Sequence, residues 1–285
     1  LSTGDRVNAT LMPISTKGNT ITFRKFASKP WTITDLISNK TINSGAAAFI
    51  WEAIQFEIPA VIAGGTATGK TSFLNSLSNF FPPNQRIVSI EDTRELQFSS
   101  FLHWVPMVTR LPNQEGKGSV TMLDLLVNSL RMRPDRIIVG EIRRQSEAEV
   151  LFEAIHTGHS VYATVHANSA QETITRLTNP PINVPKSMLP ALSMIIVQYR
   201  NRRTGIRRTF ELAEILDDST SNIIMRYDSK SDSMLKISKS KSLLNTLQLY
   251  TGITNKELNS HLKEKEAVLK WLVKKNINTV EDVGR

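Results

Sequence analysis

Residues 64–71 read Gly64-Gly65-Thr66-Ala67-Thr68-Gly69-Lys70-Thr71, a full match to the pattern G-x-x-x-x-G-K-S/T. The apolar run 58–63 comes directly before this stretch, and residues 72–77 after it have the apolar spacing of a helix. A glycine-rich turn between a strand and a helix presents backbone N–H groups and the positive end of the helix to phosphate groups. The stretch therefore predicts an α/β fold with a nucleotide-phosphate site.

Within this phosphate loop, two side chains have separate expected roles. Lys70 supplies a positive charge for the β- and γ-phosphates, and the Thr71 hydroxyl is placed to bind Mg²⁺. The competing interpretation is an incidental glycine-rich turn, which does not require the preceding strand or the following helix. We predict that the ATP contacts come from the loop and the residue after it: Gly64, Gly65, Thr66, Ala67, Thr68, Gly69, Lys70, Thr71 and Ser72.

Composition limits the classes of protein that the chain can represent. Its 285 residues are enough for a large core, and the absence of cysteine excludes disulfides and thiolate metal sites. The longest apolar stretch, 46–64, is interrupted by Glu52 and Glu57, so it does not read as a membrane span. Any membrane association is therefore expected to be peripheral.

The net charge of +9 is concentrated in two segments, 200–208 and 230–241. A basic turn between two strands and a solvated polar hairpin would account for them. Contact with acidic lipid headgroups or with a polynucleotide is the alternative interpretation.

The order of apolar segments predicts alternating strands and helices. Strands are expected at 7–13, 20–26, 58–63, 86–91, 136–140 and 160–164, and helices at 34–40, 44–56, 121–132, 147–157, 170–177, 243–250 and 255–274, with a last helical segment around Val280. From residue 58 onward this alternation indicates a mostly parallel sheet with crossover helices. We divide the chain into an opening segment 1–27, a linker 28–44, a domain 45–216 that contains the phosphate loop, and a hairpin and helical region 217–285.

A second motif points to hydrolysis. The apolar strand 136–140 ends at Glu141, which a parallel sheet would deliver to the edge where the phosphates bind. Glu141 is therefore the candidate general base. Residues 90–95, Ile90-Glu91-Asp92-Thr93-Arg94-Glu95, form an acidic box directly after another strand. Carboxylates at this density favour a bound cation, although a solvated acidic loop is the alternative.

Two histidines flank the predicted strand 160–164. His166 follows its C-terminal end, where it could contact the γ-phosphate, and His159 precedes its N-terminal end. An isolated histidine is more often a surface or capping residue, so only the neighbouring motifs favour a functional role.

These motifs, in the order phosphate loop, acidic box, 133–143 and 157–170, resemble those of the secretion ATPase superfamily of type II and type IV secretion, type IV pili and the archaellum. The resemblance covers residues 5–216. The segments 4–9, 21–26, 258–260 and 271–272 are most similar to the archaeal branch of that superfamily.

The resemblance implies a RecA-like ATPase domain that works as a homo-hexamer, preceded here by only the last strands of an N-terminal α/β domain. It implies that Glu141 activates water, that Glu91 and Asp92 of the acidic box hold Mg²⁺ with Thr71, partly through water, and that Glu95 assists catalysis. It places His166 near the γ-phosphate and His159 near the nucleotide. Arg6 and Arg24 are expected to reach the phosphates in the assembled hexamer, from their own chain or a neighbour.

The resulting expectation is an ATP-hydrolysing motor at the cytoplasmic face of the membrane, docked on a polytopic platform protein and acting indirectly on pilin-like or filament subunits, without direct contact to nucleic acid. A RecA-type DNA translocation or conjugation motor is the first alternative. It explains the phosphate loop and the basic charge but not the histidines. A scaffold that binds nucleotide without hydrolysing it is the second.

Overall fold

This computed structural model describes residues 5–25 and 29–284 of the chain. Among these residues, nine strands form the main sheet. The strand order is β11-β10-β9-β8-β3-β7-β6-β4-β5. The strands are β3 (Ala60–Gly64), β4 (Arg86–Glu91), β5 (His103–Val108), β6 (Arg136–Val139), β7 (Ser160–Val165), β8 (Met194–Arg200), β9 (Arg207–Ile215), β10 (Ser221–Asp228) and β11 (Ser233–Lys236). From β8 to β5 neighbouring strands are parallel, whereas β8 to β11 pair antiparallel. The predicted α/β class with a mostly parallel sheet is confirmed.

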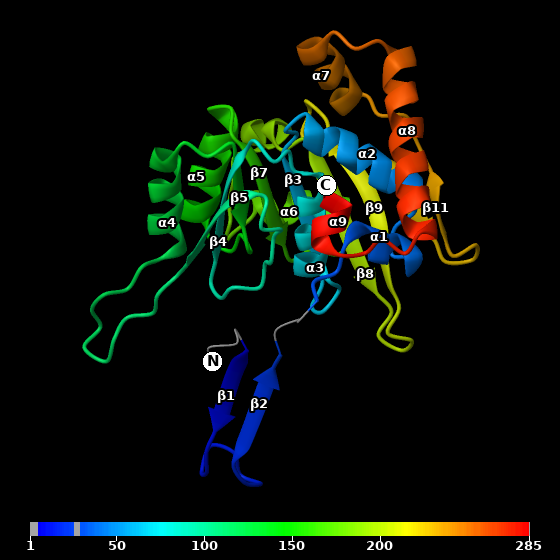
Figure 1. The fold of residues 1–285 in the computed structure, drawn as a ribbon. Helices are drawn as coiled ribbons and strands as arrows, with labels where there is room; N and C mark the ends of the chain where they lie inside the picture. Colours follow the sequence, from blue (N-terminus) through cyan, green and yellow to red (C-terminus); the bar gives the residue numbers. More distant parts are fainter. Residues whose placement is uncertain (1–4, 26–28, 285) are drawn as a thin grey trace.

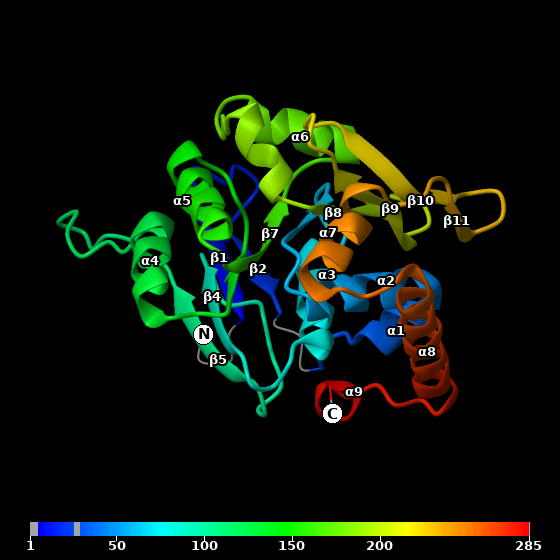
Figure 2. The same ribbon diagram turned by 90° about the horizontal axis from the view of Figure 1, so that it is seen from above.

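Helices cover both faces of this sheet (Figures 1 and 2). They are α1 (Ile33–Ser38), α2 (Ser44–Gln55), α3 (Lys70–Leu77), α4 (Met122–Ser129), α5 (Gln145–His156), α6 (Ala170–Thr178), α7 (Ser242–Thr251), α8 (Asn255–Lys274) and α9 (Val280–Gly284), with short 3₁₀ turns at Ser78–Phe80, Leu130–Met132 and Lys186–Ala191. All predicted helices are present, with ends shifted by a few residues.

Strand β3 shows how the two cores arise from alternation along a strand. Ala60 and Ile62 belong to the core beneath α1, α2 and α3, and Val61 and Ala63 belong to the core beneath α4, α5 and α6. A strand that is buried on both faces must be apolar at every position, as parallel strands between helix layers usually are. This explains the unbroken apolar run before the phosphate loop.

The main sheet continues into the C-terminal region. Strand β10 pairs with β9, so the predicted division at residue 216 does not coincide with a break in the sheet. Helix α8 packs on α2, where buried Glu52 accepts from Lys265 and lies 3.3 Å from the His261 ring nitrogen. Separating a buried ion pair of this kind costs several kcal/mol, so α8 is firmly attached.

Strand β5 is absent from the predicted elements. It contains Pro106, which has no N–H for a ladder, and such a strand is normally assigned to a loop. Here it is the last strand of the sheet and pairs only with β4, so the position of the proline is tolerated.

The opening segment forms a separate antiparallel hairpin of β1 (Arg6–Thr10) and β2 (Thr20–Arg24), which projects from the body of the molecule (Figure 1). Its register pairs Arg6 with Arg24. Both arginines therefore lie on one face of the hairpin. Gly4, the first residue of the motif segment 4–9, lies outside the described residues. So do Phe26, the last residue of the predicted strand 20–26, and residues 27 and 28.

Candidate functional site

The phosphate loop joins β3 to α3 at the carboxyl edge of the sheet, between β7 and β8. Gly69, with φ of 93°, is the residue before the first turn of α3, a backbone conformation that favours glycine. At Gly64 a Cβ atom would lie 2.7 Å from the backbone oxygen of Gln198 on β8. A side chain cannot be added there without moving the strand, so both glycines are required by the local backbone.

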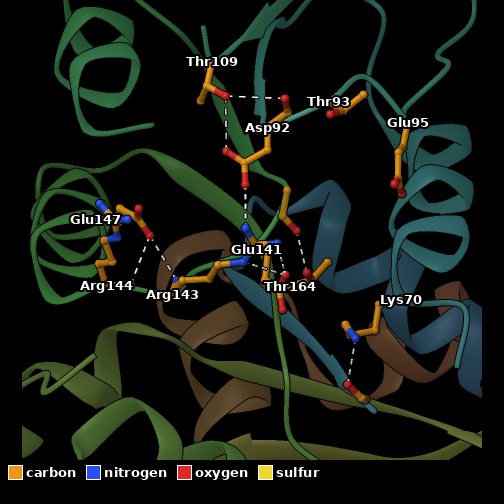
Figure 3. A network of polar contacts seen from close by, with 12 residues as sticks. Lys70, Asp92, Thr93, Glu95, Thr109, Glu141, Arg143, Arg144, Glu147 and Thr164 are labelled. Atoms are coloured by element: carbon orange, nitrogen blue, oxygen red, sulfur yellow. Dashed lines mark hydrogen bonds and ion pairs between the residues drawn. The ribbon is translucent and has the colours of Figure 1, made fainter. Parts of the chain in front are cut away.

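Lys70 lies across the loop and donates to the backbone oxygens of Gly64 and Gly65 at 2.8 and 3.0 Å (Figure 3). Burial lowers its pKa, and the carboxylate of Glu141 acts in the opposite direction. Lys70 therefore lies within the loop, close enough to Glu141 for their charges to interact.

One cavity of about 820 Å³ brings most of the predicted site residues together, although Gly64, Gly65 and His159 are not in its lining. Its lining includes residues from the phosphate loop, the acidic box, the end of β6, the end of β7 and the N-terminal hairpin: Thr66, Ala67, Thr68, Gly69, Lys70, Thr71, Ser72, Glu91, Asp92, Glu95, Glu141, His166, Arg6 and Arg24. This volume is within the range of small-molecule sites. The assigned roles of these residues remain predictions, but their proximity is a property of the structure.

Glu141 follows β6 and is tied to Arg143. The Nε and Nη2 atoms of Arg143 donate to Glu141 Oε2 at 3.0 and 2.7 Å, and Nη1 donates to Asp92 Oδ2 at 2.7 Å (Figure 3). The backbone just before Glu141 is fixed as well, because Gly140 N donates to the oxygen of Ile90 on the neighbouring strand. The predicted base therefore stands beside the acidic box.

Glu91 anchors the acidic box from inside. Its side chain is 3% exposed, and Oε1 accepts from the backbone N–H groups of Glu95 and Leu96 at 2.9 and 3.1 Å. Burial raises the pKa of Glu91 to about 7, although these two hydrogen bonds oppose the shift. Its Oε2 is buried, and no residue in the described part of the chain forms a hydrogen bond with it.

A divalent cation fits this donor set. Glu91, Asp92 and Thr71 all line the same cavity, and their carboxylate and hydroxyl groups are the oxygen ligands that Mg²⁺ prefers. Among the described residues no three His, Asp or Glu side chains are grouped closely enough to hold a metal by themselves. Such an ion would therefore need phosphate oxygens and water as further ligands, as P-loop sites commonly provide.

Glu95 is the partner of the two arginines of the hairpin. Arg6 Nη2 and Arg24 Nη2 each lie 3.0 Å from Glu95 Oε1, and Arg6 also donates to the backbone oxygen of Thr93 at 3.3 Å. These contacts attach the hairpin to the acidic box within one chain. Arg6 and Arg24 border the cavity, but here a carboxylate binds their charge, and their contact with the phosphates in a hexamer stays a prediction.

The two histidines lie at opposite ends of β7. His166 is exposed at the carboxyl end and borders the cavity. His159 precedes the amino end, and its ring Nδ1 lies 3.1 Å from the oxygen of Ala154 at the end of α5. A six-residue strand spans about 20 Å. The assignment of His159 as a nucleotide contact within this chain is therefore corrected, because its ring caps a helix end at the far edge of the sheet.

Arg143 and Arg207 are among the lining residues of the cavity to which sequence reasoning assigned no role. Arg207, in the basic segment 200–208, donates from Nε to the oxygen of Ala67 in the phosphate loop at 3.1 Å. The segment is a basic turn between β8 and β9, as predicted, yet its end contacts the loop rather than only solvent. No local pattern reveals this, since the antiparallel pairing of β8 and β9 brings residues 140 positions apart together.

Within the described residues, we find no helix with the length and apolar character of a membrane span.

The chain is similar in sequence to a known protein family and to several curated proteins. The family model described as "Type II/IV secretion system protein" matches residues 5–232. An uncharacterized protein of Methanocaldococcus jannaschii, MJ1287, is 38% identical over 260 residues, which are 88% of this chain and 95% of that protein. The type IV secretion system protein PtlH of Bordetella pertussis is 30% identical over 238 residues, covering 72% of this chain and 70% of PtlH.

Among solved structures, the pilus retraction motor PilT with bound ADP has a TM-score of 0.54 at 18% identity, covering 91% of this chain and 78% of PilT. This likeness confirms the RecA-like fold. The chain spans only 39% and 23% of two further M. jannaschii relatives, so whole-protein properties are not transferred from them. Because the family match covers most of its length and the similarity to PtlH supports it, the chain belongs to the type II/IV secretion system protein family, the family of the secretion ATPases.

Proposed function

We propose that this chain hydrolyses ATP to ADP and phosphate and that the energy drives a secretion or filament-assembly machine. The supporting observation is that the phosphate loop with Lys70 and the carboxylate of Glu141 face one cavity. The lowering of the Lys70 pKa by burial, opposed by Glu141, is further evidence that the two groups lie close together. Phosphoryl transfer to water requires a positive group that binds the phosphates, here the ammonium of Lys70, beside a base that can accept the proton of water, here Glu141.

In this proposal each group of the chain has a defined task. The backbone N–H groups of residues 64–71 and the ammonium of Lys70 bind the β- and γ-phosphates. Glu141 orients a water molecule and takes its proton as the new P–O bond forms and the bond to the ADP oxygen breaks. Thr71, Asp92 and Glu91 would hold Mg²⁺, which neutralises phosphate charge when bound.

The finer proposal is a homo-hexameric motor of a type IV pilus-like or archaellum system, or of a protein secretion system, at the inner face of the cell membrane. The family match supports it, as do the similarity to PtlH, a type IV secretion system protein, and the likeness of fold to PilT, a pilus retraction motor. We further propose a polytopic platform protein as the docking partner and pilin-like subunits as indirect substrates.

The first test is an ATPase assay on the whole protein that contains this chain, with and without single-stranded DNA. We expect Mg²⁺-dependent phosphate release that DNA does not change, because none of the groups assigned to the reaction requires a nucleic acid. Stimulation by DNA of tenfold or more would favour the DNA motor. Nucleotide binding without turnover, with the platform protein present, would favour the scaffold.

A second prediction concerns the arginines of the hairpin. Arg6→Ala and Arg24→Ala are each expected to lower turnover by about 10- to 1,000-fold with ATP affinity and assembly retained, since a guanidinium that stabilises transition-state charge contributes at about this level. Arg203→Ala is the matched control, because this arginine is exposed in the β8–β9 turn.

Mixing either arginine variant with Glu141→Gln subunits asks whether the arginine acts on its own site or on a neighbour's. Recovered turnover requires an arginine from one chain and a base from another. Unimpaired turnover in both single variants would instead limit the arginines to attaching the hairpin through Glu95.

A further inference from the structure

Arg143 joins the predicted base to the acidic box with a single side chain. Its contacts to Glu141 at 2.7 and 3.0 Å both end on Oε2, and none of the described residues donates to Glu141 Oε1. The contact to Asp92 ends on Oδ2, while Asp92 Oδ1 accepts from Thr109 at 3.3 Å (Figure 3). All three guanidinium nitrogens are therefore engaged by carboxylates.

The backbone that carries Arg143 is fixed from two directions. The N–H groups of Arg143 and Arg144 both donate to Glu147 Oε2, at 3.0 and 3.1 Å, and Glu147 is mostly buried in the first turn of α5. On the preceding residue, Ile142 N donates to the backbone oxygen of Thr164 on β7 at 3.0 Å. The guanidinium thus projects from a rigid segment, as an orienting group requires.

The charges explain why an arginine is needed at this position. Glu141 and Asp92 follow β6 and β4, which are neighbours in the sheet, so their carboxylates would repel each other without a cation between them. The hydrogen bonds that Arg143 donates to Glu141 are the main cause of the raised pKa of Arg143, and its guanidinium stays charged under all ordinary conditions. A planar fork that contacts two carboxylates also fixes their orientation, which the ammonium of a lysine cannot do equally well.

We infer that Arg143 is a positioning residue for ATP hydrolysis: it holds Oε2 of Glu141 against the acidic box and leaves Oε1 free to take the proton of the attacking water. This inference rests on the proposed function. Direct binding of phosphate by Arg143 is the competing role. It would require the guanidinium to release at least part of its contacts to Glu141 and Asp92.

The test compares Arg143→Ala and Arg143→Lys with Arg144→Ala in the whole protein. Arg144 is adjacent and exposed, so its removal changes the net charge equally without touching Glu141 or Asp92. For Arg143→Ala we expect kcat to fall about 100-fold, as a misplaced catalytic group typically does, with KM for ATP and the affinity for ADP within about threefold of wild type. Arg143→Lys should recover part of the loss, and Arg144→Ala should match wild type.

A double variant distinguishes action through Glu141 from an independent role. If Arg143 acts through Glu141, adding Arg143→Ala to Glu141→Gln should slow turnover less than about threefold further. A full additional 100-fold loss, or a loss of ADP affinity in Arg143→Ala, would overturn the inference. Unchanged turnover in Glu141→Gln alone would instead overturn the proposed base. Thermal melting of each variant confirms that the compared proteins are folded.

Discussion

Replacing Lys70 with alanine is expected to abolish measurable ATP binding and turnover. Lys70 is the only lysine or arginine between residues 64 and 75, so no residue in the loop can replace its charge. Arg207 contacts the same loop, but its Nε is occupied by the oxygen of Ala67. A charge-assisted contact to phosphate is among the stronger polar interactions in proteins, so its removal should be visible in both binding and turnover.

The measurement is ADP binding by calorimetry together with phosphate release. Lys117→Ala is the matched control, because it removes the same charge from an exposed side chain outside the cavity. The control should retain full affinity. Wild-type hydrolysis by Lys70→Ala would show that the phosphate loop has been assigned to the wrong reaction.

The parts of the fold that sequence predicts are those whose signals are local. The run 58–63, the glycines at 64 and 69 and the helical spacing of 72–77 each depend on a few adjacent residues, and the structure has them as β3, loop and α3. The same holds for Glu141, since a parallel sheet must bring strand ends to one edge. The position of His166 at the carboxyl end of β7 follows from the same rule.

Features that depend on pairing between distant segments could not be predicted in the same way. The link from Arg143 to Asp92 joins two strand ends 51 positions apart, and Glu95 meets the hairpin arginines only because the opening segment folds back onto the acidic box. His159 and His166 occur in similar sequence contexts, but they lie at opposite ends of the six-residue strand β7 and therefore at opposite edges of the parallel sheet. Strand β5 was not predicted because it contains Pro106, and no local pattern indicates that this segment lies at the edge of the sheet, where a proline is tolerated.

Glu141→Gln is expected to bind ATP with nearly wild-type affinity and to hydrolyse it about 100- to 10,000-fold more slowly, as loss of a general base typically does. Glutamine has almost the same shape but cannot accept a proton as a carboxylate does. The amide oxygen of the glutamine can still accept a hydrogen bond from Arg143, so the structure around the site should persist. Binding is measured with ADP, and turnover by phosphate release under single-turnover conditions.

The matched control is Glu153→Gln, an exposed glutamate on α5. It should behave as wild type. Unchanged turnover in Glu141→Gln would move the role of the base to Glu91, Asp92 or Glu95, the other carboxylates of the cavity. Loss of binding in Glu141→Gln would identify the residue as a cation ligand instead. The two failures are distinct, because a missing base leaves the ground-state complex intact whereas a missing cation ligand weakens it.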